Sequence, residues 1–362
     1  MIAFSDPKIN YFRRKSKINK SILKTLNSGL YINSNEVKNF EKNFSKYLNV
    51  KHCIGVGNAT DAIYLALRML KVGKGDYVIT PSHTATGTVL AIINTGAKPI
   101  FIDVKESDFN IDSSLITKKF LKLAKAIILV HLYGQPCHMD DFIYFSNKFK
   151  IPIIEDCSQA AGAKYKNKKV GSMGVMGCFS FFPTKNLSSY GDGGLISTNN
   201  NIYEKKLRSL KEYGWNKNRD TISRGINSRL DEIHAAILNV KLKFLDSDNK
   251  ERRLIASRYN KKITNKKIIK PLENQTSYHV YHLYVIRTKF RNKLIKKLNE
   301  NNIFPGVHYR LPVHEQKIFK KYAKNNLKIT EKISNEIVSL PIFPGLKISQ
   351  QNKIIKIINN FL

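Results

Sequence analysis

Between residues 52 and 198 the sequence alternates short apolar runs with amphipathic segments, and this alternation constrains the fold more than any other feature. Apolar runs of about four to eight residues favour buried strands, and segments with apolar residues at helical spacing favour helices. Strands that are apolar on both faces are typical of a mostly parallel sheet covered by helices on both sides. The predicted strands are 52–57, 77–80, 98–104, 126–134, 151–156, 178–183 and 193–198, and the predicted helices between them are 61–70, 88–96 and 140–149.

Two more helices, 16–28 and 36–48, precede this region, and together they predict a large α/β domain of about 240 residues. Residues 231–263 have the pattern of one or two long helices that leave it. The pattern then changes to a strand, a helix and a terminal amphipathic helix, at 278–286, 291–302 and 349–362. Because 362 residues exceed what one hydrophobic core usually organises, we predict two domains, a large one at 1–245 and a small α+β one at 246–362.

The composition, with 42% hydrophobic and 25% charged residues, excludes a disordered or fibrous chain. No apolar stretch reaches the roughly 18 residues of a membrane span, and the first residues lack the order of a secretory signal. The cysteines have no zinc spacing and favour reduced thiols; they are Cys53, Cys137, Cys157 and Cys178. His131 and His138 lack carboxylate partners at ligand spacing, so structural roles are expected for them. We therefore expect a cytoplasmic protein with no membrane partner and no metal site.

The chain is strongly basic, with 62 Lys and Arg against 27 Asp and Glu and a formal charge of +35. A basic chain can bind nucleic acid, an anionic membrane or an anionic substrate. Here 49 of the 62 cations are lysine, and they are scattered with no dense basic block. This distribution favours a solvated surface of biased composition, or a field that attracts an anionic substrate, over a nucleic-acid interface.

Ligands of open α/β sheets bind beyond the carboxyl ends of the strands, so the residues that follow each strand are candidates for the site. After strand 52–57 the sequence Asn58-Ala59-Thr60-Asp61 opens a helix, where we expect Thr60 to cap the helix while its hydroxyl and nearby amides face an anion. The surrounding G-x-G-x-x-T resembles a broken dinucleotide fingerprint. Because the third glycine is missing and Asp76 precedes its strand, nicotinamide binding is not expected.

Two further strand ends carry a carboxylate and a lysine. Glu155 and Asp156 close strand 151–156, where a carboxylate can hold a protonated ring nitrogen or simply cap a helix. Lys185 follows strand 178–183, where it can serve as an amine nucleophile or remain a solvated surface group. A phosphate-binding helix start, a ring-nitrogen carboxylate and a buried lysine, in that order, are the parts that a pyridoxal phosphate (PLP) site requires.

With these parts in this order, the chain resembles the DegT/DnrJ/EryC1/StrS family of PLP-dependent sugar aminotransferases, which have the aspartate-aminotransferase (type I PLP) fold. The resemblance runs nearly end to end and is most specific around Lys185. It is carried by GLYINSNEVKNFE, GVGNATDAIYLAL, VITPSHTATGTVLAI, VHLYGQPCHMDD, IIEDCSQAAGA, FSFFPTKNLSSYGDGG, INSRLDEIHAAIL and VHYRLPVHEQ.

The resemblance implies a role for each matching residue. Lys185 would form the imine with PLP and act as the catalytic acid and base, Asp156 would pair with the pyridine nitrogen, and Gln159 would lie beside the ring. The phosphate would be held by the Ala59 backbone, Thr60 and Ser180, and by Asn227 of the neighbouring subunit, since family active sites lie at a homodimer interface. Substrate contacts are implied for Tyr31, Tyr190, Arg229, His308 and Tyr309.

The sequence departs from the family at one position. Many members have an aromatic residue after the threonine of the PS-x-T strand end, and here that residue is Ala85. His83 is therefore our candidate for stacking on the cofactor ring, and the alternative is a His83 that satisfies loop hydrogen bonds. Arg229 has two interpretations: it receives the carboxylate of the amino donor, or it pairs with Asp231 or Glu232.

The resemblance also suggests a reaction. Relatives that remove a hydroxyl carry histidine in place of Lys185, so transamination is expected, with glutamate as donor and the pyridoxamine form of the cofactor between half-reactions. PSHTATGTV and VHLYGQP look more like members that aminate carbon 3 of a dTDP-linked 3-keto-6-deoxyhexose. The alternatives are amination at carbon 4 of a dTDP- or UDP-linked 4-keto sugar and, from another class, a nucleic-acid-binding regulator on a retired enzyme fold.

Overall fold

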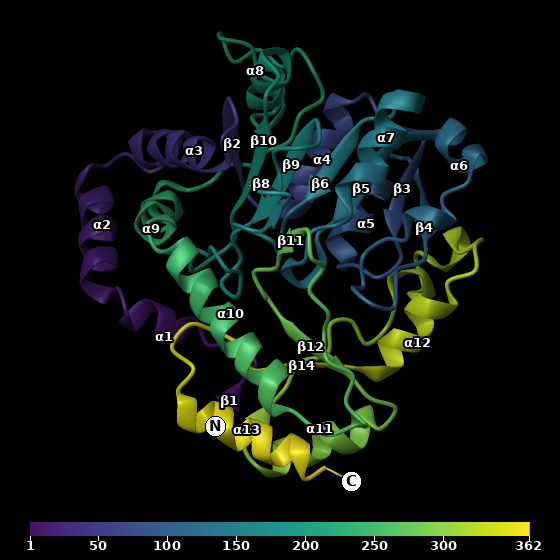
Figure 1. Ribbon diagram of the computed structural model, residues 1–362. Helices are drawn as coiled ribbons and strands as arrows, with labels where there is room; N and C mark the ends of the chain where they lie inside the picture. Colours follow the sequence, from purple (N-terminus) through teal and green to yellow (C-terminus); the bar gives the residue numbers. More distant parts are fainter. Residues whose placement is uncertain (362) are drawn as a thin grey trace.

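The computed structural model describes residues 1–361 and is built around a seven-stranded sheet (Figure 1). The strand order is β2-β10-β9-β6-β5-β3-β4. β10 is antiparallel to both of its neighbours, and the other pairs are parallel. The strands are β2 (His52–Val56), β3 (Tyr77–Pro81), β4 (Lys98–Ile102), β5 (Ala124–Val130), β6 (Ile153–Asp156), β9 (Met176–Ser180) and β10 (Gly194–Thr198).

Helices cover both faces of this sheet, because successive residues of its strands point to opposite sides and both sets are apolar. One face packs against α4 (Ala59–Met69), α5 (Thr86–Asn94) and α8 (Asn201–Leu210). The other face packs against α3 (Asn35–Leu48), α6 (Lys118–Leu123), α7 (Met139–Phe149) and α9 (Glu232–Leu242). The predicted large, mostly parallel α/β sheet is therefore confirmed.

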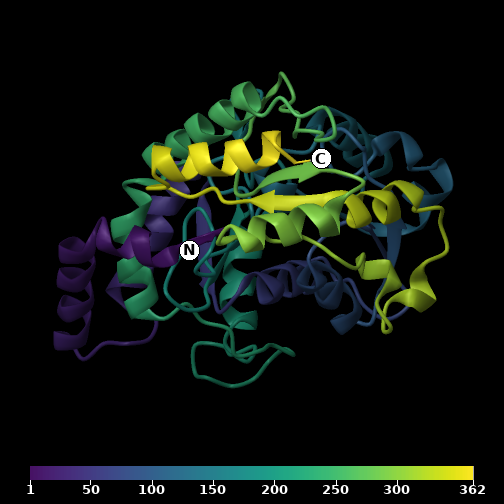
Figure 2. The same cartoon turned by 90° about the horizontal axis from the view of Figure 1, so that it is seen from below.

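The last hundred residues form a smaller α+β layer, which lies below the sheet in Figure 1 and in front of it in Figure 2. Helix α10 (Leu245–Lys262) leads into it, and β12 (Tyr284–Arg287) pairs with β14 (Ile337–Leu340). Its remaining elements are α11 (Arg291–Glu300), β13 (Ile303–Phe304), the 3-10 turns η3 (Val313–Glu315) and η4 (Lys320–Tyr322), α12 (Lys328–Glu336) and α13 (Ile348–Asn359).

Two short strands connect this layer to distant parts of the sequence. β1 (Ile2–Ala3) pairs in parallel with β13, so the first residues lie beside the C-terminal elements, and α1 (Pro7–Phe12) and α2 (Lys15–Asn27) then lead back to the sheet. β11 (Ser277–Tyr278) pairs with β7 (Lys164–Tyr165), which pairs in turn with β8 (Lys168–Lys169). The division at residue 245 stays a prediction; it coincides with the first residue of α10.

The two predicted strands that differ most from the structure do so for one shared reason. Strand 126–134 ends at Val130 and continues as a 3-10 turn, η2 (Leu132–Gly134), and strand 278–286 is interrupted between Tyr278 and Tyr284. The N–H groups of Val280 and Leu283 donate to the carbonyls of Gly134 and Tyr133 instead of to a strand partner. The terminal helix ends at Asn359, and the predicted residue Leu362 lies outside the described part of the chain. No helix within residues 1–361 is long and apolar enough to cross a membrane.

Glu232 fixes α3 to α9 across the outer face of the sheet. Its carboxylate is buried, and it accepts the backbone N–H groups of Ser34, Glu36 and Val37 at 2.5, 2.7 and 3.3 Å. The N-cap residue Ser34 makes no side-chain capping bond of its own, so a residue almost 200 positions away replaces it.

We expect Glu232→Ala to lower the free energy of unfolding by about 3 kcal/mol, because several buried N–H groups lose their acceptor. Urea denaturation at equilibrium measures the loss. Asp231→Ala is the matched control: its carboxylate is more than half exposed, and the change should stay within about 0.5 kcal/mol. Equal losses in the two variants would contradict the role of Glu232.

Candidate active site

A cavity of about 240 Å³ lies at the carboxyl ends of the central strands and gathers most of the predicted cofactor residues. Six of them line it: Ala59, Thr60, Asp156, Gln159, Ser180 and Lys185. A larger cavity of about 810 Å³ lies at the β4 edge of the sheet, near Tyr77 and Lys98 at the starts of β3 and β4, and contains none of them. The chemistry-bearing residues therefore belong to the smaller cavity.

One wall of the cavity is the N-terminus of α4. The expectation that Thr60 caps this helix is wrong: Asn58 is the N-cap, and its side-chain oxygen accepts the N–H of Asp61 at 2.9 Å. The hydroxyl of Thr60 is thereby left to face the cavity beside the first N–H groups, where the helix dipole favours an anion. Gly194 allows the close approach of β10 to this turn, since a Cβ there would lie 2.4 Å from the carbonyl carbon of Asn58.

Asp156, which is buried at the end of β6, also lines the cavity. Thr88 Oγ1 donates to its Oδ2 at 2.8 Å, and the N–H and hydroxyl of Ser158 donate to its Oδ1 at 3.1 and 2.5 Å. These donors fix the orientation of the carboxylate while it faces the cavity. A buried carboxylate so held favours the protonated form of a ring nitrogen next to it.

Lys185 lines the same cavity from the connection that follows β9. Burial lowers the pKa of its amine to about 8, against the opposing attraction of Asp156. A larger fraction of the amine is therefore neutral near pH 8 than for a surface lysine. Burial and the charge of Lys185 also lower the pKa of His308, to about 4, so this imidazole is neutral near the site.

Gln159, which follows β6, lines the cavity and connects it to Tyr309 of the C-terminal layer. The Gln159 side chain accepts the backbone N–H of Tyr133 at 2.7 Å and donates to the Tyr309 hydroxyl at 2.9 Å. The Tyr133 hydroxyl donates to the carbonyl of His308, and His308 Nδ1 lies 2.9 Å from the hydroxyl of Ser339 on β14. The structure thus brings the two predicted substrate residues 308 and 309 to the cofactor cavity.

His83 is buried next to this group. Its Nε2 lies 2.7 Å from the Tyr133 hydroxyl, and since that hydroxyl donates to His308, His83 is the donor at Nε2. Burial lowers the pKa of His83 to about 3, so the ring is neutral. From the same loop the cavity wall includes Thr84 and Ala85. These contacts suit a histidine that satisfies loop hydrogen bonds, and stacking by His83 stays a prediction.

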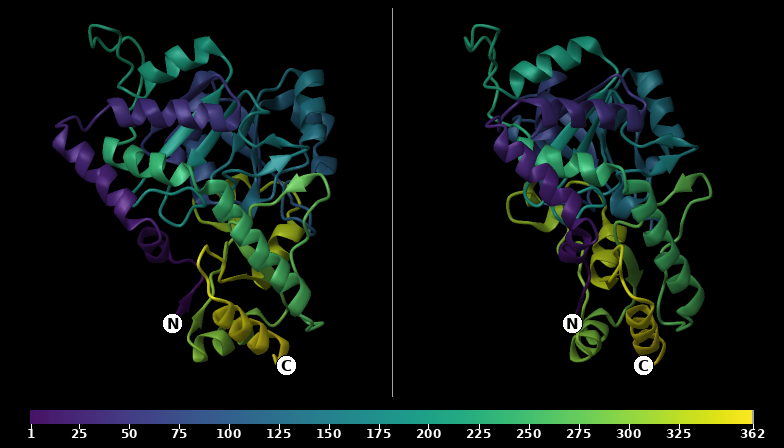
Figure 3. Two further views of the ribbon diagram at one scale, coloured as in Figure 1. Left: turned by 60° about the vertical axis from the view of Figure 1, so that its left-hand side comes forward. Right: turned by 90° about the vertical axis from the view of Figure 1, so that its left-hand side faces the viewer.

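Other predicted residues lie away from the cavity of the single chain. Asn227 is exposed in the segment 211–228, which extends from the rest of the chain near α8 (Figure 3). The guanidinium of Arg229 lies 6.0 Å from the ring centre of Tyr213, and within residues 1–361 it forms no ion pair with Asp231 or Glu232. Tyr31 is half-exposed, and its hydroxyl donates to the carbonyl of Leu26; Tyr190 is partly buried beside Lys241.

Thr88 and Ser158, the partners of Asp156, are not among the residues predicted from the sequence. The contact of Ser158 could have been predicted, because a hydroxyl two residues after an aspartate commonly forms a hydrogen bond with its carboxylate. Thr88 is less readily predicted: it follows Thr84 by one helical turn, at the start of a helix that opens beyond a strand.

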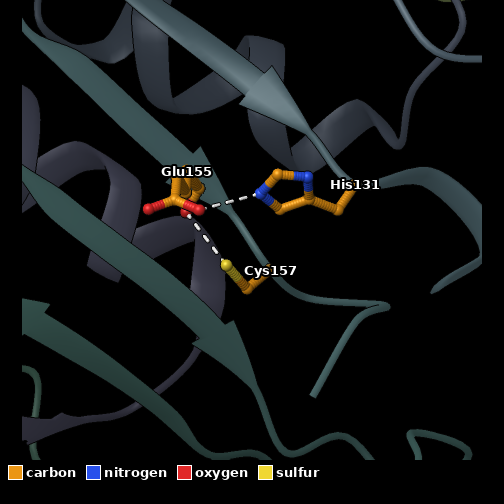
Figure 4. Close-up of side chains that lie close together, drawn as sticks. All are labelled: His131, Glu155 and Cys157. Carbon is orange, nitrogen blue, oxygen red and sulfur yellow. Dashed lines mark hydrogen bonds and ion pairs between the residues drawn. The ribbon is translucent and has the colours of Figure 1, made fainter. Parts of the chain in front are cut away.

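Glu155 points away from the cavity into a second polar cluster (Figure 4). His131, Glu155 and Cys157 have their ligand atoms within 4.8 Å of one another, so His131 does have a carboxylate partner in space. However, His131 Nδ1 accepts the N–H of Cys137 at 3.0 Å, so its Nε2 carries the proton that it donates to Glu155 at 3.1 Å. Neither imidazole nitrogen keeps a lone pair for a metal.

The cluster is therefore structural. Glu155 also accepts the N–H groups of Gly171, Met173 and Gly174 at 2.8, 2.8 and 2.6 Å. Burial opposes ionisation of Glu155, but these bonds and the one from His131 outweigh it and lower the pKa of the carboxyl. The carboxylate thereby fixes the turn before β9 to the end of β6.

A helix start, a buried carboxylate and an amine of lowered pKa around one small cavity suit PLP: the helix would hold the phosphate, Asp156 the ring nitrogen and Lys185 the aldehyde. Together with the sheet order, this site defines a PLP-dependent enzyme of the aspartate-aminotransferase fold.

Comparison with known proteins gives the family. The model of the DegT/DnrJ/EryC1/StrS aminotransferase family matches residues 13–359, and the chain belongs to this family. It is 40% identical over 361 residues to the dTDP-3-amino-3,6-dideoxy-alpha-D-galactopyranose transaminase of Aneurinibacillus thermoaerophilus, covering 100% of this chain and 99% of that one. It is 39% identical to the pleiotropic regulatory protein of Geobacillus stearothermophilus, covering 97% and 96%.

A solved structure agrees along the whole chain. The crystal structure of S. venezuelae DesV in complex with a ketimine intermediate matches with a TM-score of 0.95 and 34% identity, covering 99% of this chain and 97% of that one. The chain is a PLP-dependent sugar aminotransferase, and the family, fold and cofactor predicted from the sequence are confirmed.

We expect Glu155→Gln to lower the free energy of unfolding by about 3 kcal/mol, since the new amide group directs a donor at N–H groups that need an acceptor. Asp140→Asn, which removes a solvent-exposed pair with Lys166, should cost at most about 1 kcal/mol. Zinc and a chelator should both leave the unfolding midpoint of the wild type unchanged. A midpoint that rises with zinc and falls back in Glu155→Gln would contradict the structural role.

Proposed function

We propose that this chain transfers the amino group of glutamate to carbon 3 of a dTDP-linked 3-keto-6-deoxyhexose, giving the 3-amino-3,6-dideoxyhexose. The observation that carries the proposal is the arrangement of Lys185, Asp156 and the α4 N-terminus around one cavity. The specific sugar is supported by the name of the A. thermoaerophilus relative, which matches the chain over its full length.

When bound, PLP supplies an electron sink and carries the amino group between the two substrates. The Lys185 Nζ removes the proton from the α-carbon of glutamate and later delivers a proton to carbon 3 of the sugar. A pKa of about 8 suits both tasks, because the amine exchanges a proton readily near neutral pH. Asp156 would keep the ring nitrogen protonated, and Gln159, which lines the cavity, is held by its hydrogen bond to Tyr309 of the C-terminal layer.

We also propose a homodimer in which Asn227 reaches the cavity of the partner subunit. Two observations support it: segment 211–228 extends from the body of the chain (Figure 3), and a run of apolar side chains is exposed on and after α2. They are Leu23, Leu26, Leu30, Tyr31 and Ile32, each more than 40% exposed. Exposed apolar patches of this kind mark protein interfaces. A monomer in analytical ultracentrifugation at micromolar concentration would contradict the dimer.

We place the enzyme in the cytoplasm. All four cysteines are free and buried, which suits a reducing compartment. Fractionation of producing cells tests the location.

A regulatory function is the second candidate, because one relative is named a pleiotropic regulatory protein. The complete set of Lys185, Asp156, Gln159 and Ser180 in one cavity favours the enzyme. Salt-dependent DNA binding by a protein that forms no cofactor band would favour the regulator.

The first experiment is an absorbance spectrum of the protein with PLP, before and after addition of glutamate. We expect a band of the enzyme-bound cofactor that glutamate converts to the pyridoxamine form. Keto sugars linked to dTDP, with the ketone at carbon 3 or carbon 4, are then added separately, and the first should restore the band. NMR of the product locates the new amine; an amine at carbon 4 would overturn the proposed regiochemistry, and no band at all would overturn the site.

Replacement of the two central residues should separate their roles. Lys185→Ala should lower turnover by about 10²–10⁴-fold or more, since the proton-transfer group is lost, whereas the exposed Lys168→Ala should not change it. Asp156→Asn should lower turnover about a hundredfold, because loss of the ion pair lowers the pKa of the ring nitrogen by about two units. Steady-state kinetics measure both, and unchanged rates in either variant would refute that residue's role.

A further inference from the structure

We propose that Lys241 of α9 is a positioning residue for the segment that carries Lys185, acting through the hydroxyl of Ser188 and the ring of Tyr190. This inference rests on the proposed function, because it concerns the lysine assigned there to the cofactor. Neither the sequence motifs nor the cavity lining assigns Lys241 a role.

The contacts of Lys241 are short and directed at one segment. Its side chain is buried, and Nζ donates to Ser188 Oγ at 2.6 Å. The same Nζ lies 4.8 Å from the ring centre of Tyr190, within cation–π range. Ser188 and Tyr190 follow Lys185 by three and five residues in the connection between β9 and β10. The amine therefore contacts the lysine-bearing segment at two points.

Other bonds hold the remaining sides of this segment. The N–H of Lys185 donates to the Phe182 carbonyl at 2.9 Å, and the N–H of Ser189 donates to the Phe181 carbonyl at 2.7 Å. The side chain of Asn186 donates to Asn249 of α10 at 2.7 Å. The hydrogen bond from Lys241 to Ser188 is the polar contact that fixes this segment to α9. Loss of that contact would free one side of the segment while the others stay anchored.

The electrostatic surroundings make Lys241 an unusual buried cation. Within residues 1–361 no carboxylate lies within ion-pair distance of its Nζ, and the only acid among the nearby charges, Asp248, is engaged by Arg14 at 2.5 Å. Arg14 and Arg252 add further positive charge, and the Tyr190 hydroxyl has no partner within the described chain. Burying an ammonium group without a carboxylate partner lowers the stability of the fold. The contacts of Lys241 with Ser188 and Tyr190, and the segment that these contacts hold in place, must offset that cost.

The consequence for the site follows from charge and distance. The pKa of Lys185 reflects its burial and the attraction of Asp156, and both change when the segment moves. Burial lowers the pKa of Lys241 itself to about 7, so near neutral pH its hydrogen bond to Ser188 changes between a charge-assisted and a weaker neutral form. The position of Lys185, and with it the titration of the bound cofactor, should therefore depend on Lys241.

The first test uses the cofactor-loaded enzyme and compares Lys241→Met, Ser188→Ala and their double variant. We expect the pH midpoint of the cofactor absorbance to shift by at least about half a unit in the same direction in both single variants, with no further shift in the double variant. Lys241→Arg should restore most of the midpoint. Lys243→Met, which removes an exposed lysine two residues further on, is the matched control and should leave the midpoint unchanged.

The second test needs no cofactor. The pKa of Lys241 is about 7 in the folded chain and about 10.4 when unfolded, so between these values the unfolded state binds more protons. Stability that depends on Lys241 is therefore present at high pH and is lost as the pH falls toward 7. The melting temperature of the wild type, relative to that of Lys241→Met, should rise between pH 7 and about pH 10.

The outcomes separate the two proposals. If the wild type forms no cofactor band, the proposed function is wrong, whatever the melting curves show. If the band forms but its midpoint is the same in Lys241→Met, Ser188→Ala and the wild type, the positioning role is wrong and the proposed function stands. If the difference in melting temperature between the wild type and Lys241→Met does not change across this pH range, Lys241 does not titrate as a buried cation, and that part of the proposal is refuted as well.

Discussion

Two consecutive carboxylates, Glu155 and Asp156, are buried at the end of β6, and each needs hydrogen-bond donors from the protein around it. The alternation of a strand sends them to opposite faces of the sheet. Glu155 accepts hydrogen bonds from three backbone N–H groups and from His131. Asp156 accepts them from Thr88 and Ser158 and still faces the cavity. One carboxylate thus builds the scaffold on which the other is held for chemistry.

Around Lys185, burial and neighbouring charges together set the protonation states of the ionisable groups. Histidines near the cavity are neutral, because burial and the positive charge of the lysine lower their pKa values. The attraction of Asp156 limits how far the pKa of Lys185 itself falls. The amine is thereby kept close to the protonation equilibrium that proton transfer requires. Nearby, the Gln159 side chain accepts the N–H of Tyr133 and donates to the hydroxyl of Tyr309, and the second of these bonds joins the sheet to the C-terminal layer.

The parts of the site that could be predicted from sequence are those that follow directly from strand ends. Asp156 and Lys185 close or follow apolar runs, and the motifs around them are specific, so both lie where they were expected. Thr88 could not be assigned, since its hydroxyl meets Asp156 only after α5 packs beside β6. The interrupted strand 278–286 could not be foreseen either: its backbone partners lie in the turn at residues 133–134. Asn227 and Arg229 lie away from the cavity of the single chain, and the pattern of strands and helices does not predict where the segment that carries Asn227 lies.

The orientation of one strand has a topological consequence for the lysine. Gly194 at the start of β10 lies directly opposite Ser180 at the end of β9, because these two strands are antiparallel. The chain can then return into the sheet from the edge at which it left, as in a wide hairpin, without the long crossover that a parallel neighbour demands. Residues 181–193 therefore form a loop whose two ends are both fixed at the edge of the sheet that carries Asp156. Had β10 run the other way, the same residues would have crossed a face of the sheet, and Lys185 would have travelled away from Asp156.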